Sequence, residues 1–557
     1  MMFTWMKLWE GQSILSPDPN RVSPDLAELA RKSRTAPPVD TLDRAQRTLG
    51  AKIMRSVVFG GLRYVFVVPI PFIMTPLILH RIGVAGYGTW AVFLAINGLT
   101  SLADLGLMGT LSKFVAEYYA RQDFPALARL LSSGLALFLL LDLAIGIALW
   151  VASPLLAGRL FRGSTVTSIE LIVLLRCFLI VIAANILTQL FASVTTGLQR
   201  LDLTNVISAA NVMLSALFGA LLLLRGWGLR GLVYGYIGSG IMTVVIYLIV
   251  VKRLLPQVAL NPARFDRTEA RKMFGYSLRL YITQAAVAVH NQVEKVFLAM
   301  LVGVGPVGWY DIASDIALKV RGSIGFILSP VLPAASELNA LGDESRMKEL
   351  YYRTHKYLAL CGVPAVCYVV AISSRFVELW IGPSMKMIAL PLSVLLVVNY
   401  FNLATGPGFL ILAGKGDMKP GIQSAILGVV MNVILSLGLI YKFGFAGAVL
   451  GTSVSLIIAS GYFMMLFHRR TGYLISRVLQ ESYWKPILCS VLVLTVLLAI
   501  RPAKDLSWAG LAATGIVFGI FYAVAILLCR FFDEYDWSKI ESIMPVARVA
   551  RRLSRIA

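Results

Sequence analysis

Apolar segments about twenty residues long recur along this chain from Ile53 almost to its C-terminal end. A helix needs ~20 mostly apolar residues to cross the ~30 Å hydrocarbon core of a bilayer. The runs are too long and too continuous for the alternating strands of a membrane barrel, so helices are the remaining way to satisfy the backbone in lipid. With 58% hydrophobic and 14% charged residues, the chain is also too apolar for a soluble globular protein. The sequence therefore predicts a polytopic all-α membrane protein.

About fourteen transmembrane helices are expected where apolar runs lie between charged residues and Gly or Pro breaks. They are residues 54–79, 88–110, 132–156, 169–196, 205–224, 231–251, 275–302, 308–334, 357–380, 387–413, 421–441, 446–467, 485–500 and 508–529. These spans divide the chain into six parts: a cytoplasmic polar tail (1–52), a first lobe with spans one to six (53–251), a basic cytoplasmic loop (252–274), a second lobe with spans seven to twelve (275–467), a C-terminal helix pair (468–530) and a basic cytoplasmic tail (531–557).

The formal charge of +22 indicates orientation rather than nucleic-acid binding. Lys and Arg are spread along the loops and never form one long basic stripe, which argues against a nucleic-acid partner. With a cytoplasmic N-terminus, roughly 36 of the 51 Lys and Arg residues fall on the cytoplasmic side and about ten fall outside, as the positive-inside rule requires. We therefore expect a bacterial inner-membrane protein with both termini in the cytoplasm, in contact with membrane lipids.

Three short motifs occur twice, in the same order and about 220 residues apart. The pairs are Gly83–Tyr87 with Gly305–Trp309, Asn211–Ser215 with Asn432–Ser436, and Gly228–Gly235 with Gly444–Gly451. They predict two parallel six-helix lobes related by a pseudo-twofold axis, plus two C-terminal helices. Two such lobes enclose a cleft, the usual ground plan of an alternating-access transporter. The alternative is that duplication only built a stable bundle, and the small-xxx-small spacings in the third pair are typical of close helix packing.

Enzyme signatures are missing from the sequence. There is no nucleotide-binding lysine motif, no Ser/His/Asp arrangement in a plausible context and no paired-Asp motif of the kind that glycosyltransferases use. The five cysteines and four histidines have no metal-ligand spacing. We therefore expect no catalytic residue, no metal site and no cofactor.

Ionisable residues at membrane depth are costly, so each one is a candidate functional residue. Eight of them lie on spans one, two, seven and eight: Arg63, Asp104, Glu294, Lys295, Asp311, Asp315, Lys319 and Arg321. Asp311, Asp315 and Lys319 are four residues apart and form one helical stripe, with Arg321 on another face. Because spans seven and eight are the repeat equivalents of one and two, we expect all four spans to face the same cleft.

The charges predict two kinds of role. Arg and Lys in a membrane cavity suit an anionic ligand, since they bind phosphate oxygens through charge-assisted hydrogen bonds. The acidic residues would carry a coupling ion or balance those cations. Structural alternatives remain open: Lys319 or Arg321 would be ion-paired with Asp315 or a neighbouring carboxylate, Glu294 and Lys295 would neutralise each other, and Arg63 and Asp104 would lie near the interfaces.

Several segments carry a resemblance to a known family: Thr75–Trp90, Asp104–Leu107, Ser112–Tyr119, Asn291–Val296 and Gly303–Tyr310. Over about residues 54–470 the chain resembles the polysaccharide-type flippases of the multidrug/oligosaccharidyl-lipid/polysaccharide exporter superfamily, the O-antigen and exopolysaccharide unit flippases. The additional C-terminal pair of helices is also typical of them. Glu294 stands where family members more often have Asp, and the long polar N-terminal tail is unusual.

The resemblance implies a two-lobed, fourteen-helix fold with a central cationic cavity. It implies a non-enzymatic flippase that moves a polyprenyl-pyrophosphate-linked glycan from the cytoplasmic to the periplasmic leaflet during polysaccharide biosynthesis. On this likeness Arg63, Lys295, Lys319 and Arg321 would contact the pyrophosphate or an acidic sugar. The implied partners are the lipid-linked glycan itself and the glycan polymerase and glycosyltransferases of the same pathway.

Three other functions fit parts of the sequence. A cation-coupled multidrug exporter on the same fold would favour a cavity of carboxylates and aromatics, whereas spans seven and eight offer three cations. A membrane-embedded glycan polymerase or ligase would place catalytic residues on a sizeable external loop, and no external loop here exceeds ~15 residues. A scaffold for a biosynthetic complex would leave the intramembrane charges unexplained.

Overall fold

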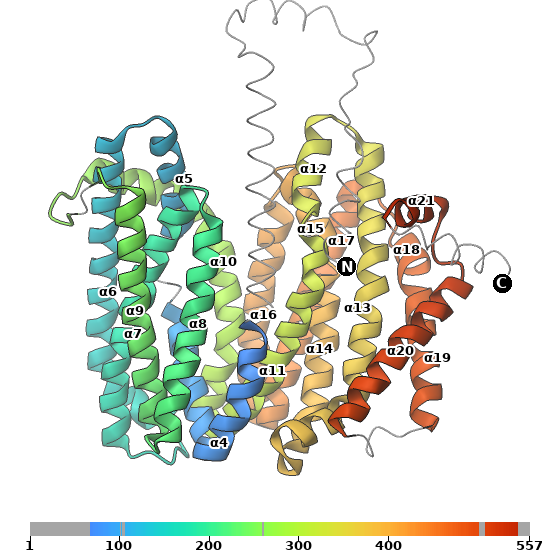
Figure 1. Ribbon diagram of the computed structural model, residues 1–557, viewed down its shortest axis with the longest axis horizontal. Helices are drawn as coiled ribbons and strands as arrows, with labels where there is room; N and C mark the ends of the chain where they lie inside the picture. The colour runs from blue at the N-terminus through green and yellow to red at the C-terminus, as the bar shows by residue number, and fades with distance from the viewer. Residues whose placement is uncertain (1–66, 101, 103–105, 259–260, 501–506, 544–557) are drawn as a thin grey trace, which may run out of the picture. The chain divides into compact units, whose positions relative to one another are not determined.

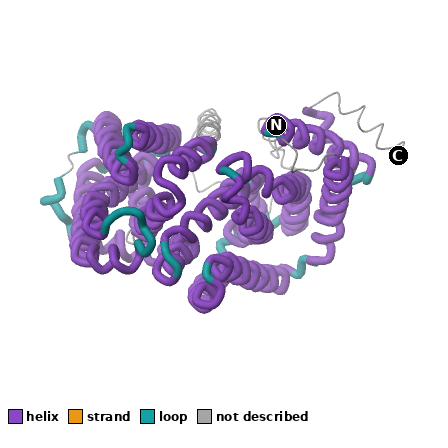
Figure 2. The backbone as a smooth tube through the Cα atoms, turned by 90° about the horizontal axis from the view of Figure 1, so that it is seen from below, coloured by secondary structure: helices purple, strands orange, loops and turns teal. Residues whose placement is uncertain are grey.

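The computed structural model describes residues 67–543 except 101, 103–105, 259–260 and 501–506. Within these residues the chain consists of helices joined by loops and contains no strand, as Figure 2 shows. Twelve of the described helical segments are long and apolar enough to cross a membrane. The predicted all-α, multi-span membrane fold is therefore confirmed, whereas the number fourteen and the division into two lobes stay predictions. Arg63 and Asp104 lie outside the described residues.

The first half of the chain contributes six described helices. They are α4 (Pro69–Thr100), α5 (Leu107–Ala120), α6 (Phe124–Leu160), α7 (Ser168–Gly197), α8 (Leu201–Leu224) and α9 (Gly228–Leu254). The second half begins with α10 (Arg267–Leu301), which has the length of a span but is too polar to be counted among the twelve. The following helices are α11 (Val304–Gly325), α12 (Val331–Ala340), α13 (Glu344–Ile381), α14 (Ala389–Leu403), α15 (Gly406–Gly414), α16 (Lys419–Phe443) and α17 (Phe445–Thr471).

Helix α4 differs from the predicted separation of spans one and two. It runs through the expected link at residues 80–87 and bends at Gly83, whose φ of 70° and ψ of −179° are not helical. Only glycine adopts such a backbone conformation without steric cost, so a single residue replaces a loop. The helix ends at Thr100, and a new helix, α5, starts after Gly106, which has a left-handed φ of 74°.

Helix α6 presents an apolar face that the rest of the described chain leaves exposed. Its exposed side chains are Leu139, Leu140, Leu143, Ile147, Trp150, Val151 and Leu155. A soluble protein would bury a stripe of this kind, whereas lipid tails are as apolar as these side chains. This exposed apolar face is therefore what a lipid-facing helix would present.

Three helices connect the two halves of the chain. Helices α5–α9 contact one another, and so do α12–α17, while α4 and α10 contact members of both sets and α11 contacts α4 and members of the second set (Figure 1). Helix α11 packs against α4 on one side and α14 on the other. Helix α10 packs against α5 and α6 and also against α16. Helices α10 and α11 carry the predicted charged residues, so these residues lie where the halves meet.

The halves approach closely at the first pair of duplicated motifs and the residues that flank them. A Cβ added to Gly88 on α4 would overlap the carbonyl oxygen of Val304 and lie 2.6 Å from its carbonyl carbon. A Cβ on Gly308 would lie 3.2 Å from the backbone nitrogen of Gly88. The Val304 amide also donates to the carbonyl oxygen of Arg162, at 3.0 Å. Backbone therefore meets backbone here, and only glycine permits it.

The small-residue spacings also act as packing positions, at equivalent places in both halves. A Cβ on Gly235 of α9 would lie 2.6 Å from the backbone nitrogen of Gly219 on α8. A Cβ on Gly451 of α17 would lie 2.7 Å from the Ser436 hydroxyl on α16. Such close approach compensates for the weak hydrophobic drive between helices in lipid.

After α17 come α18 (Ile475–Val478), a π-helical turn (Leu479–Tyr483), α19 (Trp484–Ile500), α20 (Trp508–Leu528) and α21 (Glu534–Ile543). Near its start, α20 is held to α13, because the Tyr368 hydroxyl donates to the Leu511 carbonyl. Of the described residues, those from Ile516 to Ile543 belong to a separate compact unit. In that unit Asp533 caps α21 by accepting from the Asp536 amide at 2.8 Å.

Candidate functional site

Lys295, Asp311 and Tyr87 form one charge network on α10, α11 and α4. Lys295 Nζ lies 2.6 Å from Asp311 Oδ1, and the two side chains are only 13% and 11% exposed. The Tyr87 hydroxyl donates to the other carboxylate oxygen of Asp311, at 2.9 Å. A buried charge is tolerated only when it is paired and hydrogen-bonded, and both conditions hold here. The network also joins α4 to α11 one residue away from the Gly88 contact.

Glu294 occupies a different environment from its neighbour Lys295. It is fully buried, and its Oε1 accepts hydrogen bonds from Asn432 on α16 and from Thr452 on α17, the latter at 2.9 Å. The Tyr310 hydroxyl lies 2.7 Å from Thr452 Oγ1. The pairing of Glu294 with Lys295, one of the alternatives, is not seen, because consecutive helical residues point in different directions.

Within the described chain, buried oxygens without a partner occur on Glu294, on its partner Asn432 and on Ser436, one helical turn after Asn432 on α16. Glu294 Oε2, Asn432 Oδ1 and the Ser436 hydroxyl are buried and have no hydrogen-bond partner among the described residues. Buried polar atoms are normally paired, so each exception needs a reason. Carboxylate, amide and hydroxyl oxygens are ligands for hard cations, and a carboxylate is also a proton acceptor.

Lys319 and Arg321 lie further along α11 and have different partners. Lys319 forms an ion pair with Asp315 one helical turn earlier, and the two side chains are 21% and 41% exposed. Arg321 Nη2 donates to Asn402 Oδ1 on α14 at 2.9 Å, and Asn402 in turn donates to Ser460 on α17 at 2.9 Å. Arg321 Nε is buried without a hydrogen-bond partner in the described part of the chain.

The structure thus brings together part of the predicted set. Lys295, Asp311, Asp315 and Lys319 form two successive ion pairs along α11, on the stripe that the helical spacing predicts. Glu294 and Arg321 lie apart from that stripe, each with polar partners from the second half.

Sequence reasoning missed the uncharged partners. Tyr87, Asn432, Thr452 and Asn402 hold the charged side chains, yet none is ionisable. Asn432 does belong to a duplicated motif, and a polar residue kept inside an apolar repeat was the available signal for it.

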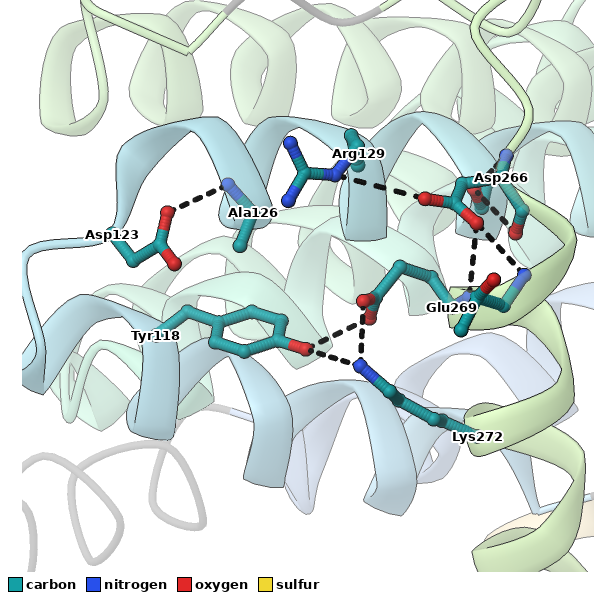
Figure 3. Close-up of polar contacts among 9 residues, drawn as sticks. Tyr118, Asp123, Ala126, Arg129, Asp266, Glu269 and Lys272 are labelled. Atoms are coloured by element: carbon teal, nitrogen blue, oxygen red, sulfur yellow. Dashed lines mark hydrogen bonds and ion pairs between the residues drawn. The ribbon is translucent and has the colours of Figure 1, made fainter.

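The N-terminal end of α10 precedes the expected span 275–302. Polar side chains anchor it to the neighbouring helices, as Figure 3 shows. Glu269 accepts from the Tyr118 hydroxyl of α5 and from Lys272, both at 2.9 Å. The adjacent Asp266 caps α10 by accepting from the Thr268 amide at 2.7 Å. Its own amide donates to Ser133 of α6 at 2.8 Å.

We call Tyr118, Asp266, Glu269 and Lys272 the anchor of α10. Their contacts shift the pKa values of three of these side chains. Backbone donors, first that of Thr268, hold the pKa of Asp266 below its ordinary value. The hydrogen bond to Glu269 raises the pKa of Lys272. Burial, and then the bond to Glu269, raises the pKa of the Tyr118 hydroxyl. The anchor is therefore stable with Lys272 charged and Tyr118 neutral.

Glu269→Ala is expected to lower the melting temperature of the purified protein, because Tyr118 and Lys272 lose their acceptor. Leaving the buried Tyr118 hydroxyl unpaired costs about 1–3 kcal/mol, whereas the half-exposed Lys272 can turn to water. Glu117→Ala is the control, since Glu117 pairs at 3.0 Å with the exposed Arg121 and such pairs are worth ~0–1 kcal/mol. A raised lysine pKa gives stability below its unfolded pKa that is lost as the pH rises through the folded pKa. The difference between wild type and Glu269→Ala should therefore shrink at alkaline pH, and equal melting of both variants would rule the anchor out.

Comparison with known proteins gives a family match over the first half and the linking helices. Residues 53–339, more than half of the 557-residue chain, match the model of the family described as "Polysaccharide biosynthesis protein". The similar relatives include the "Uncharacterized membrane protein EpsK" of Bacillus subtilis, 24% identical, with 81% of this chain and 90% of the relative covered. The "Probable flippase AglR" of Haloferax volcanii is 21% identical, with 70% and 78% covered. The "Putative O-antigen transporter" of Shigella flexneri is 20% identical, with 70% and 91% covered.

Among solved structures, the fold is similar to that of the "Lipid II flippase MurJ, inward closed conformation". The TM-score is 0.69 at 16% identity, with 84% of this chain and 99% of that chain covered. This likeness shows a shared membrane fold.

Proposed function

This chain belongs to the polysaccharide biosynthesis protein family, and on that premise we propose that it is a flippase. It translocates a polyprenyl-pyrophosphate-linked oligosaccharide, the repeat unit of a polysaccharide, across the bacterial inner membrane. Relatives named as a probable flippase and a putative O-antigen transporter support the assignment. The protein itself performs no enzymatic step; glycosyltransferases would supply the lipid-linked glycan and a polymerase would consume it.

The observation that carries this proposal is the placement of Lys295, Lys319 and Arg321. All three cations lie on α10 and α11, the helices that contact both halves. Keeping cations at membrane depth is costly, which an anionic lipid-linked substrate explains and a neutral one does not. Arg and Lys bind phosphate oxygens strongly away from bulk water. Arg63 is proposed to join them from the first span.

Alternating access requires that the contact between α4 and α11 open and close. In the structure Gly88 meets Val304 and Gly308, and Tyr87 bonds to Asp311. With the expected orientation this contact lies toward the periplasm, so it would seal that side of the substrate path. Release of the glycan would then need the Tyr87–Asp311 bond to break.

Glu294 is the proposed site of the coupling ion. Its buried carboxylate, with the free oxygens of Asn432 and Ser436, offers a cation or proton a set of ligands within the second half. Asp311 and Asp315 are assigned to charge balance, because each is already paired with a lysine. Asp104 stays a predicted member of this acidic set.

Complementation of a glycan-export mutant tests the cationic site. Lys319→Ala and Arg321→Ala, alone and together, are expected to lower export at least about tenfold at unchanged protein level, as a lost charge-assisted contact of ~1.5–3 kcal/mol predicts. Lys442→Ala, which removes an exposed lysine at the end of α16, is the control.

A further variant separates substrate binding from structure. If Lys319 only neutralises Asp315, the double variant Asp315→Ala/Lys319→Ala should restore export. Under the proposed function it should not, because the cation itself is required. Unchanged export in both single variants would contradict the cationic mechanism.

A further inference from the structure

A pocket lies in the first half of the chain, where α4 bends. Its volume is about 800 Å³, within the ~300–1,000 Å³ range of small-molecule sites. Three segments line it: the bend of α4, the start of α7 and the turn that leads into α9. The charged and aromatic residues among the lining are Arg81, Glu170, Trp227, Arg230 and Tyr234.

The pocket contains two guanidinium groups and one carboxylate. Arg230 Nε donates to Glu170 Oε1 at 2.6 Å, which fixes the guanidinium plane and leaves its terminal nitrogens without a partner among the described residues. Arg81 makes no hydrogen bond or ion pair to any described residue. The lining therefore carries a net positive charge, with planar donors that match a carboxylate or a phosphate.

An aromatic corner adjoins these charges. Trp227 and Tyr234 pack edge to face, with ring centroids 6.0 Å apart and planes at 79°, and Trp227 remains 50% exposed. The face of an aromatic ring is a large apolar surface. Such a surface packs well against the C–H face of a sugar ring and poorly against an anion that has no apolar part.

The links around the pocket contain more arginines than the positive-inside rule predicts for the periplasmic side. The three links here carry Arg81, Arg159, Arg162, Arg225 and Arg230, with Glu170 as their acidic residue. In the expected orientation they face the periplasm, where loops normally hold few cations. An orientation signal cannot explain them, whereas an anionic ligand on that side can.

We propose that this pocket binds an acidic saccharide. Arg81 and Arg230 hold its carboxylate or phosphate, Glu170 positions Arg230, and Trp227 packs against the sugar ring. The inference deepens the proposed function and rests on it for the source of the ligand, because a translocated glycan emerges on this side. A phospholipid head group would bring the anion without the sugar ring, so Trp227 distinguishes the two sources.

Calorimetric titration of the purified full-length protein in nanodiscs tests the proposal, with tri-galacturonate as the acidic probe. We expect maltotriose, its neutral counterpart, to bind at least about tenfold more weakly, since only the acid engages the guanidinium groups. Arg81→Gln, Arg230→Gln and Trp227→Leu should each weaken tri-galacturonate binding. Arg225→Gln removes an arginine of the same end that does not line the pocket, and it should leave binding unchanged.

Three results would overturn the proposal. The first is that neither trisaccharide binds, or that both bind equally. The second is that Arg225→Gln weakens binding as much as Arg81→Gln does. The third is that inorganic phosphate binds as tightly as tri-galacturonate and Trp227→Leu has no effect, which would indicate a head-group site. Because titration requires no transport, a chain that binds tri-galacturonate but exports no glycan would retain the pocket and refute the flippase assignment.

Discussion

Replacing Gly88 by alanine is expected to force α4 away from α11 and to abolish most glycan export. The added methyl group would overlap the Val304 carbonyl oxygen, and a backbone atom cannot rotate away as a side chain can. Overpacking of this kind costs about 1–3 kcal/mol. If the cost falls only on the sealed state, the equilibrium between sealed and open states shifts by roughly 5- to 150-fold. The variant should therefore rest with the proposed periplasmic seal open.

Cysteine labelling from outside the cell measures that shift. Val307 on α11 is fully buried beside the contact, so Val307→Cys should resist a membrane-impermeant maleimide until the seal opens. The five native cysteines are first replaced by serine. Gly146→Ala is the matched control, since a Cβ at Gly146 on α6 meets no atom within 4 Å. Equal labelling in the two variants would show that the glycine contact is not the seal.

The membrane fold follows from the sequence because lipid imposes a simple rule. Each run of about twenty apolar residues has to be a helix, and α6 to α9 and α13 to α17 fall on the predicted spans. The rule is less informative at two places. Gly83 replaces the loop expected between the first two spans with a bend inside α4. Helix α10 has the length of a span but is too polar to be recognised by its composition.

The candidate site was predictable in its charges but not in its asymmetry. The first repeat motif sets an offset of 222 residues, since Gly83 corresponds to Gly305. With that offset, Glu294, Lys295, Asp311, Asp315 and Lys319 correspond to Phe72, Ile73, Thr89, Phe93 and Asn97. The charged residues are therefore present in only one of the two copies. A comparison of the copies cannot reveal which side chains form hydrogen bonds or ion pairs with them. Tyr87, which reaches across to Asp311, is one such partner that only the three-dimensional packing identifies.

Glu294→Gln is expected to lower export roughly 5- to 150-fold while the protein still folds, in line with coupling energies of ~1–3 kcal/mol. The amide keeps an acceptor oxygen for Asn432 and Thr452, so the substitution removes the charge and little else. Burying a carboxylate without a cationic partner costs several kcal/mol, and the amide and hydroxyl partners of Glu294 carry no charge to offset that cost.

Thermal melting in NaCl, KCl and choline chloride provides the direct readout for Glu294. A cation at ten times its Kd adds about 1.4 kcal/mol to stability, and this gain should be present in wild type and absent in Glu294→Gln. The control is Glu269→Gln, which alters a buried carboxylate in the anchor of α10 and should lower stability while keeping the cation response. Proton coupling would replace the salt response with a pH response that depends on Glu294. Normal export by Glu294→Gln would instead exclude this residue from coupling, because export would then proceed without its charge.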